Sequence, residues 1–165
     1  KKILMLVVAL MAVGCAEDED NFSYSNPDME QIEDVYMAYV QDFIDNDFEG
    51  IASHFQTPVM RRGNGLVPTR IAMTPDELMD SYRDDKANIQ EGYKYSRIDC
   101  MYVRTMAVDL YYYLDAQYTR YNDQDEIIFE GRTLYYFSNE SGNWKMFATI
   151  PAEIDPLMCI PPSND

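Results

Sequence analysis

The residues from 45 to 54 include the side chains most able to bind a metal ion or to transfer a proton. They begin like a calcium-binding loop, because Asp45, Asp47 and Glu49 alternate and a glycine follows. The twelfth position of such a loop needs a bidentate glutamate, and Gln56 stands there instead. His54 is the only histidine of the chain and has no cysteine near it, so a zinc site is not indicated either. We expect no metal site and no cofactor.

Of the three cysteines, one follows an export-like segment and the other two are candidates for a disulfide bond. An apolar run follows two lysines, is too short to span a bilayer, and ends in a motif that resembles the lipobox of bacterial lipoproteins. We therefore expect a signal peptide over 1–14, a lipid on Cys15 and an acidic tether over 15–26. The protein would belong to the cell envelope, in the periplasm or at the outer-membrane surface. Cys100 and Cys159 could pair there, but two unpaired buried thiols fit the sequence equally well.

The charge of the chain excludes one large class of partners. Its 165 residues include 13 Lys and Arg against 29 Asp and Glu, for a formal net charge of -16. Such a chain repels a phosphate backbone, so we expect no binding to nucleic acid. A hydrophobic fraction of 47% is enough for one globular domain with its own core.

Three helices are predicted in the first half of the chain. Apolar residues recur three and four positions apart behind Pro27, which predicts a helix of about eighteen residues. A shorter helix follows over 48–55, and Pro58 would stop it. Thr74 caps a third helix that runs to about Ile89.

From Tyr93 onward the hydrophobic period changes to two, and strand-forming residues dominate. Short strand pieces are also expected at 59–62 and near 66–72, ahead of the third helix. This order indicates an α+β fold, with three N-terminal helices packed on a strongly curved, mainly antiparallel sheet of about four long strands plus short edge strands. The tail over 153–165 has no period and is expected to be irregular. The long strands are predicted over 93–104, 107–121, 126–138 and 143–150.

The order of these elements resembles the nuclear-transport-factor-2-like superfamily, the cone fold of SnoaL-like and ketosteroid-isomerase-like proteins. The resemblance rests on the motif DFEGI at 47–51, on TPDEL at 74–78 and on GNWKM at 142–146. It implies one cone-shaped domain over 27–152. In such a domain the stretch from 45 to 54 is a helix-turn-helix that seals the narrow end of the cone.

Enzymes of this superfamily keep their chemistry inside the cone. Tyr39 stands where ketosteroid isomerases carry the tyrosine that donates to a developing oxyanion, but between 56 and 75 there is no Asp or Glu to act as the matching base. We therefore favour a domain that binds a small, largely apolar ligand without catalysis. The expected pocket residues are Tyr36, Tyr39, Phe43, His54, Tyr112 and Trp144.

Two other functions stay open. A lyase, isomerase or hydrolase could use His54 and Tyr39 as acid and base, which requires that His54 points into the pocket. A non-enzymatic dimerisation or assembly module would use tyrosines on the outer face of the sheet, and we expect a homodimer through that face. On the strand over 107–121, the predicted interior residues are Leu110, Tyr112, Leu114, Ala116 and Tyr118. The predicted outer residues are Asp109, Tyr111, Tyr113, Asp115, Gln117 and Tyr121.

Overall fold

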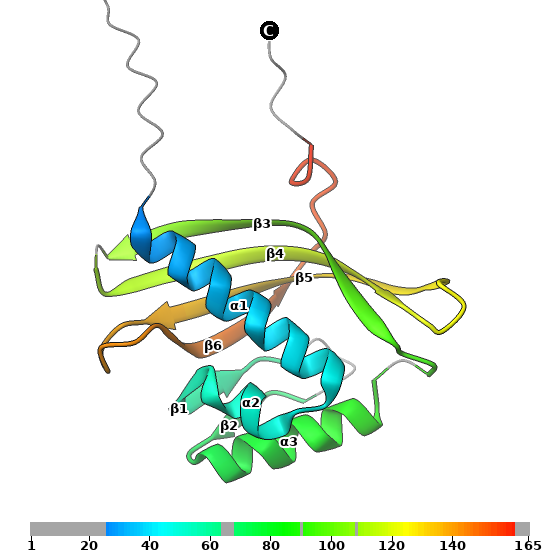
Figure 1. The fold of residues 1–165 in the computed structure, drawn as a ribbon, viewed down its shortest axis with the longest axis horizontal. Helices are drawn as coiled ribbons and strands as arrows, with labels where there is room; N and C mark the ends of the chain where they lie inside the picture. The colour runs from blue at the N-terminus through cyan, green and yellow to red at the C-terminus, as the bar shows by residue number, and fades with distance from the viewer. Residues whose placement is uncertain (1–25, 64–67, 90, 108, 161–165) are drawn as a thin grey trace, which may run out of the picture.

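Polar residues cap the helices that the sequence predicts. The computed structural model describes residues 26–63, 68–89, 91–107 and 109–160, and over these ranges it has three helices (Figure 1). Asn26 and Thr74 accept hydrogen bonds from backbone amides in the first turns of the first and third helices. Asn46 has a φ of 61° and ends the first helix, so the chain turns directly into the second. The helices are α1 (Pro27–Asp45), α2 (Phe48–Ser53) and α3 (Pro75–Ala87).

The prediction that Pro58 stops the second helix was wrong. α2 ends at Ser53, and Pro58 lies inside the strand β1 (Phe55–Arg61), after a cis peptide bond. Proline has no amide hydrogen for a strand ladder and is tolerated only where the pairing is irregular or at an edge. The pairing of β1 shifts register between Phe55 and Met60, so Pro58 falls within that irregular stretch.

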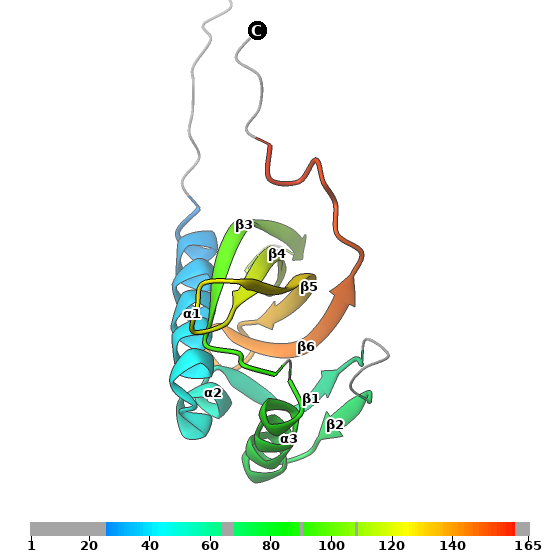
Figure 2. The ribbon, with the colours of Figure 1, turned by 90° about the vertical axis from the view of Figure 1, so that its right-hand side faces the viewer.

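The described strands form one mixed sheet in the order β2-β1-β6-β5-β4-β3. The four long strands pair antiparallel, each with the next along the chain, and β1 runs parallel to β6. Figure 2 shows that this sheet is strongly curved, with α1 along its concave side and with α3 beside its β1–β2 end. The predicted α+β class is confirmed. The strands other than β1 are β2 (Arg70–Ala72), β3 (Tyr95–Ala107), β4 (Tyr111–Tyr121), β5 (Ile127–Ser138) and β6 (Lys145–Ala152).

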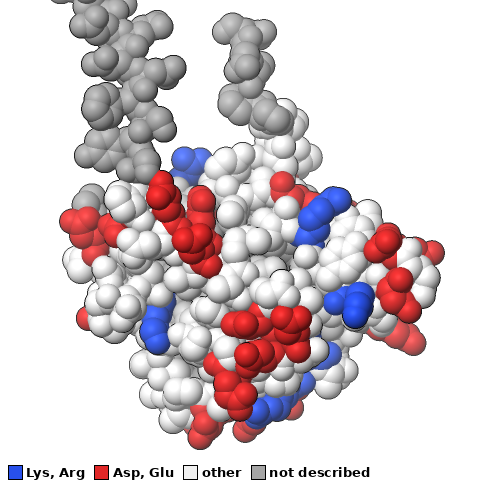
Figure 3. Space-filling view, viewed as in Figure 1, with Lys and Arg blue, Asp and Glu red and all other residues white. Residues whose placement is uncertain are grey.

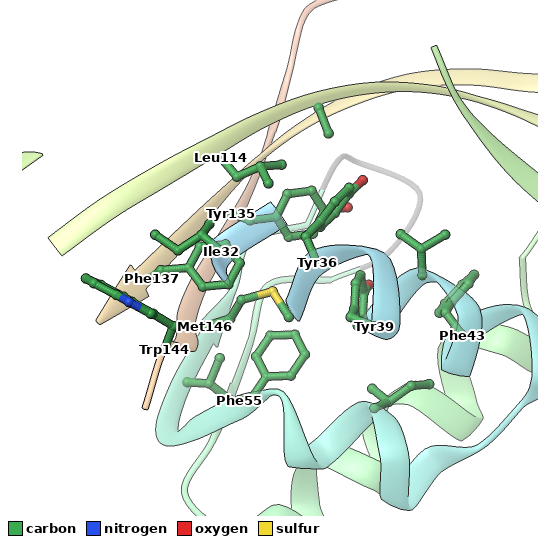
Figure 4. Packing of buried hydrophobic residues seen from close by; sticks show 14 of the residues in the cluster. Ile32, Tyr36, Tyr39, Phe43, Phe55, Leu114, Tyr135, Phe137, Trp144 and Met146 are labelled. Carbon is green, nitrogen blue, oxygen red and sulfur yellow. The ribbon is translucent and has the colours of Figure 1, made fainter. Parts of the chain in front are cut away.

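The core lies between α1 and the concave face of the sheet. Figure 4 shows Tyr36 and Tyr39 of α1 on the side of that helix that faces Leu114 and Tyr135 of the sheet. The alternation of β4 agrees with the prediction through its middle, where Tyr112, Leu114 and Ala116 are buried.

The prediction for β4 fails at its two ends. Leu110 is 50% exposed, because it lies in the turn before the strand begins. Tyr121 was expected to be exposed on the outer face, but it is buried by a stacked contact with Tyr95 of β3, at 5.0 Å between ring centroids.

The disulfide bond that the sequence left open is formed. Cys100 of β3 bonds to Cys159 in the C-terminal segment, with 5.3 Å between their Cα atoms. Next to it, the Tyr102 hydroxyl donates a hydrogen bond to the Met158 carbonyl. The bond therefore holds the C-terminal segment to β3.

Three further points concern the N-terminal residues, a membrane-spanning helix and a metal site. Cys15, the predicted signal peptide and the tether up to residue 25 lie outside the described residues. Within the described ranges, no helix is both long and apolar enough to cross a membrane. The same ranges contain no group of three or more His, Cys, Asp or Glu residues that could hold a metal ion.

Candidate functional site

A cavity of about 380 Å³ lies between α1, α3 and the ends of the strands. Its apolar surface is mainly aromatic, and its polar groups are mainly hydroxyls and guanidiniums. One carboxylate, that of Asp85 on α3, also lines it. The aromatic lining residues are Tyr39, Phe43, Tyr82, Tyr118, Phe129 and Tyr135, and the cationic ones are Arg61, Arg62, Arg70 and Arg120.

Two buried phenols form a hydrogen-bonded pair in the cavity wall. The Tyr82 hydroxyl donates to the Tyr39 hydroxyl at 3.2 Å. Burial raises the pKa of Tyr39 well above that of a free phenol, and burial also raises the pKa of Tyr82. Both hydroxyls are therefore protonated at physiological pH and serve as hydrogen-bond donors rather than as bases. Since Tyr82 already donates to Tyr39, the proton of Tyr39 can be directed at a ligand.

Arg61 is held in place on three sides. Its guanidinium donates to the Ser81 hydroxyl at 2.8 Å and to the Asp85 carboxylate at 2.7 Å. Its Cζ atom also lies 3.7 Å from the ring centroid of Tyr82, a cation–π contact. Asp85 accepts a second ion pair from Arg70 at 3.4 Å. The one carboxylate among the described residues that line the cavity is thus engaged by two guanidiniums of the protein itself.

Arg120, near the end of β4, projects among aromatic rings. Its Cζ atom lies 5.2 Å from the ring centroid of Tyr118 and 5.3 Å from that of Phe129. The rings of Phe43 and Tyr93 are each 5.7 Å away. Arg120 also lines a smaller adjoining pocket of about 30 Å³, so its charge lies at the boundary between the two spaces.

The structure brings only some of the predicted pocket residues together. Tyr39 and Phe43 line the cavity, and Tyr36 lines the adjoining pocket. Tyr112 and Trp144 line neither, and pack edge to face on each other with 5.1 Å between ring centroids. Figure 4 shows the reason, because Trp144 and Phe43 lie at opposite ends of the core.

His54 also lies outside the cavity lining. Its Nε2 atom is 2.7 Å from Asp42 Oδ2, and its side chain is 15% exposed. Its carbonyl accepts a hydrogen bond from the Met146 amide, so it links α1, the end of α2 and β6. The acid–base pair of His54 and Tyr39 is therefore not assembled at the cavity.

Lys86 of α3 covers the outside of the same aromatic cluster. Its Nζ atom lies 4.1 Å from the ring centroid of Phe43 and 4.5 Å from that of Tyr93. It also donates to the Phe43 carbonyl at 2.6 Å. Burial, followed by repulsion from Arg120, lowers the pKa of Lys86 from 10.5 to about 8. The folded state holds this proton less tightly than the unfolded chain does. Lys86 therefore makes the free energy of unfolding rise as the pH rises from about 8 to 10.5.

We expect Lys86 to react with acetic anhydride with a midpoint near pH 8, measured peptide by peptide by mass spectrometry. Arg120→Gln should raise that midpoint, because it removes the neighbouring positive charge. The same substitution at Arg104, on the exposed part of β3, is the control and should leave the midpoint unchanged. A midpoint that does not respond to Arg120→Gln would show that Arg120 does not act on Lys86.

Residues 29–154 match the family model described as NTF2-like protein (DUF6841). The chain belongs to this family. The sequence resemblance to the nuclear-transport-factor-2-like superfamily is thereby confirmed. No curated protein sequence matches this NTF2-like chain at a significant level.

Three solved structures illustrate the shared fold. An NTF2-like protein of unknown function from Pseudomonas putida has a TM-score of 0.64 at 11% identity, over 79% of this chain and 89% of that one. A protein of unknown function with a cystatin-like fold from Nostoc punctiforme has a TM-score of 0.62 at 14% identity, over 77% and 90%. A ketosteroid isomerase-like protein from Erwinia carotovora atroseptica has a TM-score of 0.57 at 18% identity, over 79% and 99%. At these identities the likeness concerns the fold of the NTF2-like domain alone.

Proposed function

We propose that this NTF2-like domain binds a small molecule with an aromatic or otherwise apolar body in its cavity, without catalysing a reaction. The observation that carries the proposal is the cavity itself. Its volume of about 380 Å³ lies within the range of about 300–1,000 Å³ that is usual for small-molecule sites. Aromatic walls with a few convergent polar groups are typical of such sites.

The polar groups of the cavity favour binding over catalysis. The phenols of Tyr39 and Tyr82 are donors, and Asp85 is engaged by Arg61 and Arg70. A proton abstraction needs a group that can accept a proton within hydrogen-bond reach of the substrate. Among the described residues that line the cavity, Asp85 is the one carboxylate and no imidazole is present. The other polar groups are mainly hydrogen-bond donors.

Native mass spectrometry of the purified protein tests this proposal. We expect an adduct that leaves under mild activation, with a mass that defines the ligand class. Thr133→Phe should abolish the adduct, because Thr133 is buried in the cavity wall and a ring there would fill the space. Thr105→Phe makes the same change at an exposed position outside the cavity and should leave the adduct in place. An adduct that survives in Thr133→Phe would place the ligand elsewhere and contradict the proposal.

A second proposal, assembly through the sheet, is favoured by an aromatic cluster on half-buried positions of the outer face. Tyr113 and Tyr136 have 6.0 Å between ring centroids, and Phe147 lies 6.1 Å from Tyr136 and 6.0 Å from Tyr111. Tyrosine-rich surfaces are common at protein interfaces. The same spectra would then show a homodimer that Tyr113→Glu converts to a monomer. A protein that is monomeric at all concentrations would exclude this function.

We also propose that a lipid on Cys15 anchors the domain in the cell envelope. The bond between Cys100 and Cys159 supports this location, because such bonds persist in oxidising compartments. Cys15→Ser should release the protein from the membrane fraction. Unchanged recovery of that variant with membranes would argue against the lipid anchor.

A further inference from the structure

The C-terminal segment over 153–160 is held against the sheet by contacts that leave its large apolar side chains in solvent. Ile154 is 46% exposed, Leu157 72% and Ile160 58%. Single apolar side chains are common on protein surfaces, but here three of them fall within seven residues of one short segment. Apolar side chains that gather in this way mark an interaction surface more often than scattered ones do.

The bonds from β3 to this segment fix its position without covering it. Cys159 is joined to Cys100 by the disulfide bond, and the Met158 carbonyl accepts a hydrogen bond from the Tyr102 hydroxyl at 2.8 Å. Both bonds reach a sulfur or a backbone atom of the segment. They therefore hold the chain in one place while the side chain of Leu157 stays in solvent.

Leu157 and Ile160 lie at the two ends of one tight turn, the C-terminal turn (157–160). The Ile160 amide donates to the Leu157 carbonyl at 3.3 Å, and the Leu157 amide donates to the Asp155 carboxylate at 2.9 Å. The Asp155 amide in turn donates to the side-chain oxygen of Gln117 on β4 at 3.2 Å. The turn is thus already ordered, so little conformational entropy is lost when its two apolar side chains are covered.

The C-terminal turn lies at the end of the molecule where the predicted tether enters. Figures 1 and 2 both show the start of α1 and the C-terminal segment at the upper end of the view. Cys15 precedes Asn26 by eleven residues, and a chain of that length reaches at most about 40 Å. A lipid on Cys15 would hold this end of the domain within that distance of the membrane. The bilayer surface is then within reach of the C-terminal turn.

The charge of the protein decides which kind of lipid surface suits it. The chain carries a formal charge of -16, and acidic side chains gather in several groups over the face drawn in Figure 3. Glu153, at the start of the C-terminal segment, is itself exposed. An anionic surface would repel such a domain. A zwitterionic surface has no net charge, so the apolar side chains can approach it without this repulsion.

We propose that the C-terminal turn inserts Leu157 and Ile160 into the zwitterionic lipid surface that holds the anchor, and so fixes how the domain stands on the membrane. This inference rests on the proposed lipid on Cys15, because it names the surface that the anchored domain contacts. Two apolar side chains bind a bilayer only weakly by themselves, since even one myristoyl chain gives marginal binding. The anchor therefore supplies the attachment, and the turn supplies the orientation.

Quenching of tryptophan fluorescence by brominated lipid tests this contact. The chain has one tryptophan, Trp144, which is buried and gives a constant background. In protein anchored to vesicles of phosphatidylcholine with brominated acyl chains, Leu157→Trp should lose most of the emission that the new side chain adds. Ile127→Trp makes the same change at a position that is 60% exposed, beside the β4–β5 hairpin (Figure 1), and should keep its emission.

The charge of the lipid gives a second test. Part of the phosphatidylcholine is replaced by phosphatidylglycerol with the same bromine content. This change should weaken the quenching of Leu157→Trp, and added salt should restore it, because salt screens the repulsion. Stronger quenching on the anionic vesicles would contradict the assignment to a zwitterionic surface.

The outcomes separate this inference from the anchor itself. A protein that does not stay with the vesicles overturns the lipid anchor. The quenching test then uses protein whose Cys15 is coupled to a maleimide phospholipid, which is selective because Cys100 and Cys159 are bonded to each other. Equal emission of the two tryptophan variants in anchored protein would overturn the inference and leave the anchor intact. A blue shift of Leu157→Trp that grows with protein concentration, without quenching, would also overturn it, because a second copy would then cover the turn.

Discussion

Replacing Asp85 with asparagine is expected to lower the free energy of unfolding by about 3–5 kcal/mol. The change keeps the shape of the side chain and removes the charge that balances Arg61. Both side chains are largely buried, at 16% exposure for Arg61 and 10% for Asp85, and their atoms lie 2.7 Å apart. Removal of one partner leaves the other charge desolvated and uncompensated, which is among the most destabilising single changes in a protein. Urea unfolding followed by circular dichroism measures the loss.

Asp84 provides the matched control for this prediction. Asp84 lies one residue before Asp85 in the same helix and contacts Arg70 at 3.2 Å, but its side chain is 66% exposed. Asp84→Asn should therefore cost less than about 1 kcal/mol, as exposed ion pairs usually do. The double variant Arg61→Met with Asp85→Leu should recover most of the lost stability, because it removes both buried charges together. If Asp84→Asn and Asp85→Asn had equal effects, the buried pair would not be the cause.

The fold could be predicted because its signals are local. The caps Asn26 and Thr74, and the change of hydrophobic period near Tyr93, place the helices and long strands close to where they lie. Pro58 failed as a boundary marker because a proline can also occupy an irregular strand pairing, and the partner strand that makes it irregular comes about ninety residues later in the chain. That information is absent from any short window of sequence.

The candidate site was less predictable because its polar half comes from separated segments. Helical period was enough to place Tyr39 and Phe43 on the inner side of α1, where the cavity lies. Three of the arginines come from three different strands and Arg62 from the loop after β1, and nothing local links them. One signal existed for Arg120: it continues the inward alternation of Leu114, Ala116 and Tyr118 along β4. A charged residue at an inward-facing strand position indicates either a buried ion pair or a cavity with polar groups.

His54, Tyr112 and Trp144 show the opposite error. Each was chosen for the chemistry of its side chain, but each has a structural contact that accounts for its presence. Trp144 donates to Asp28 at 3.3 Å, and Tyr112 accepts a hydrogen bond from Asn26 at 3.2 Å. These contacts hold the start of α1 against the sheet. A functional group on a predicted inner face therefore does not by itself locate a cavity.

The double variant Cys100→Ser with Cys159→Ser is expected to lower the free energy of unfolding by about 4 kcal/mol. The disulfide closes a loop with a sequence separation of 59, and in the chain-entropy description a loop of this length restricts the unfolded state by about that amount. Urea unfolding of the oxidised protein and of the variant measures the difference. Reduction of the parent protein should give the same loss, and the variant should not respond to the reductant.

Removal of the disulfide should lower the stability of the protein without changing ligand binding in the cavity. It joins β3 to the C-terminal segment, and neither cysteine lines the cavity. The double serine variant should therefore keep the native mass spectrometry adduct of the parent protein while it remains folded, in contrast to Thr133→Phe, which should lose it. Loss of less than about 1 kcal/mol would mean that noncovalent contacts such as Tyr102 with Met158 already hold the segment. Loss of the adduct in a folded serine variant would instead mean that the C-terminal segment controls the shape of the cavity.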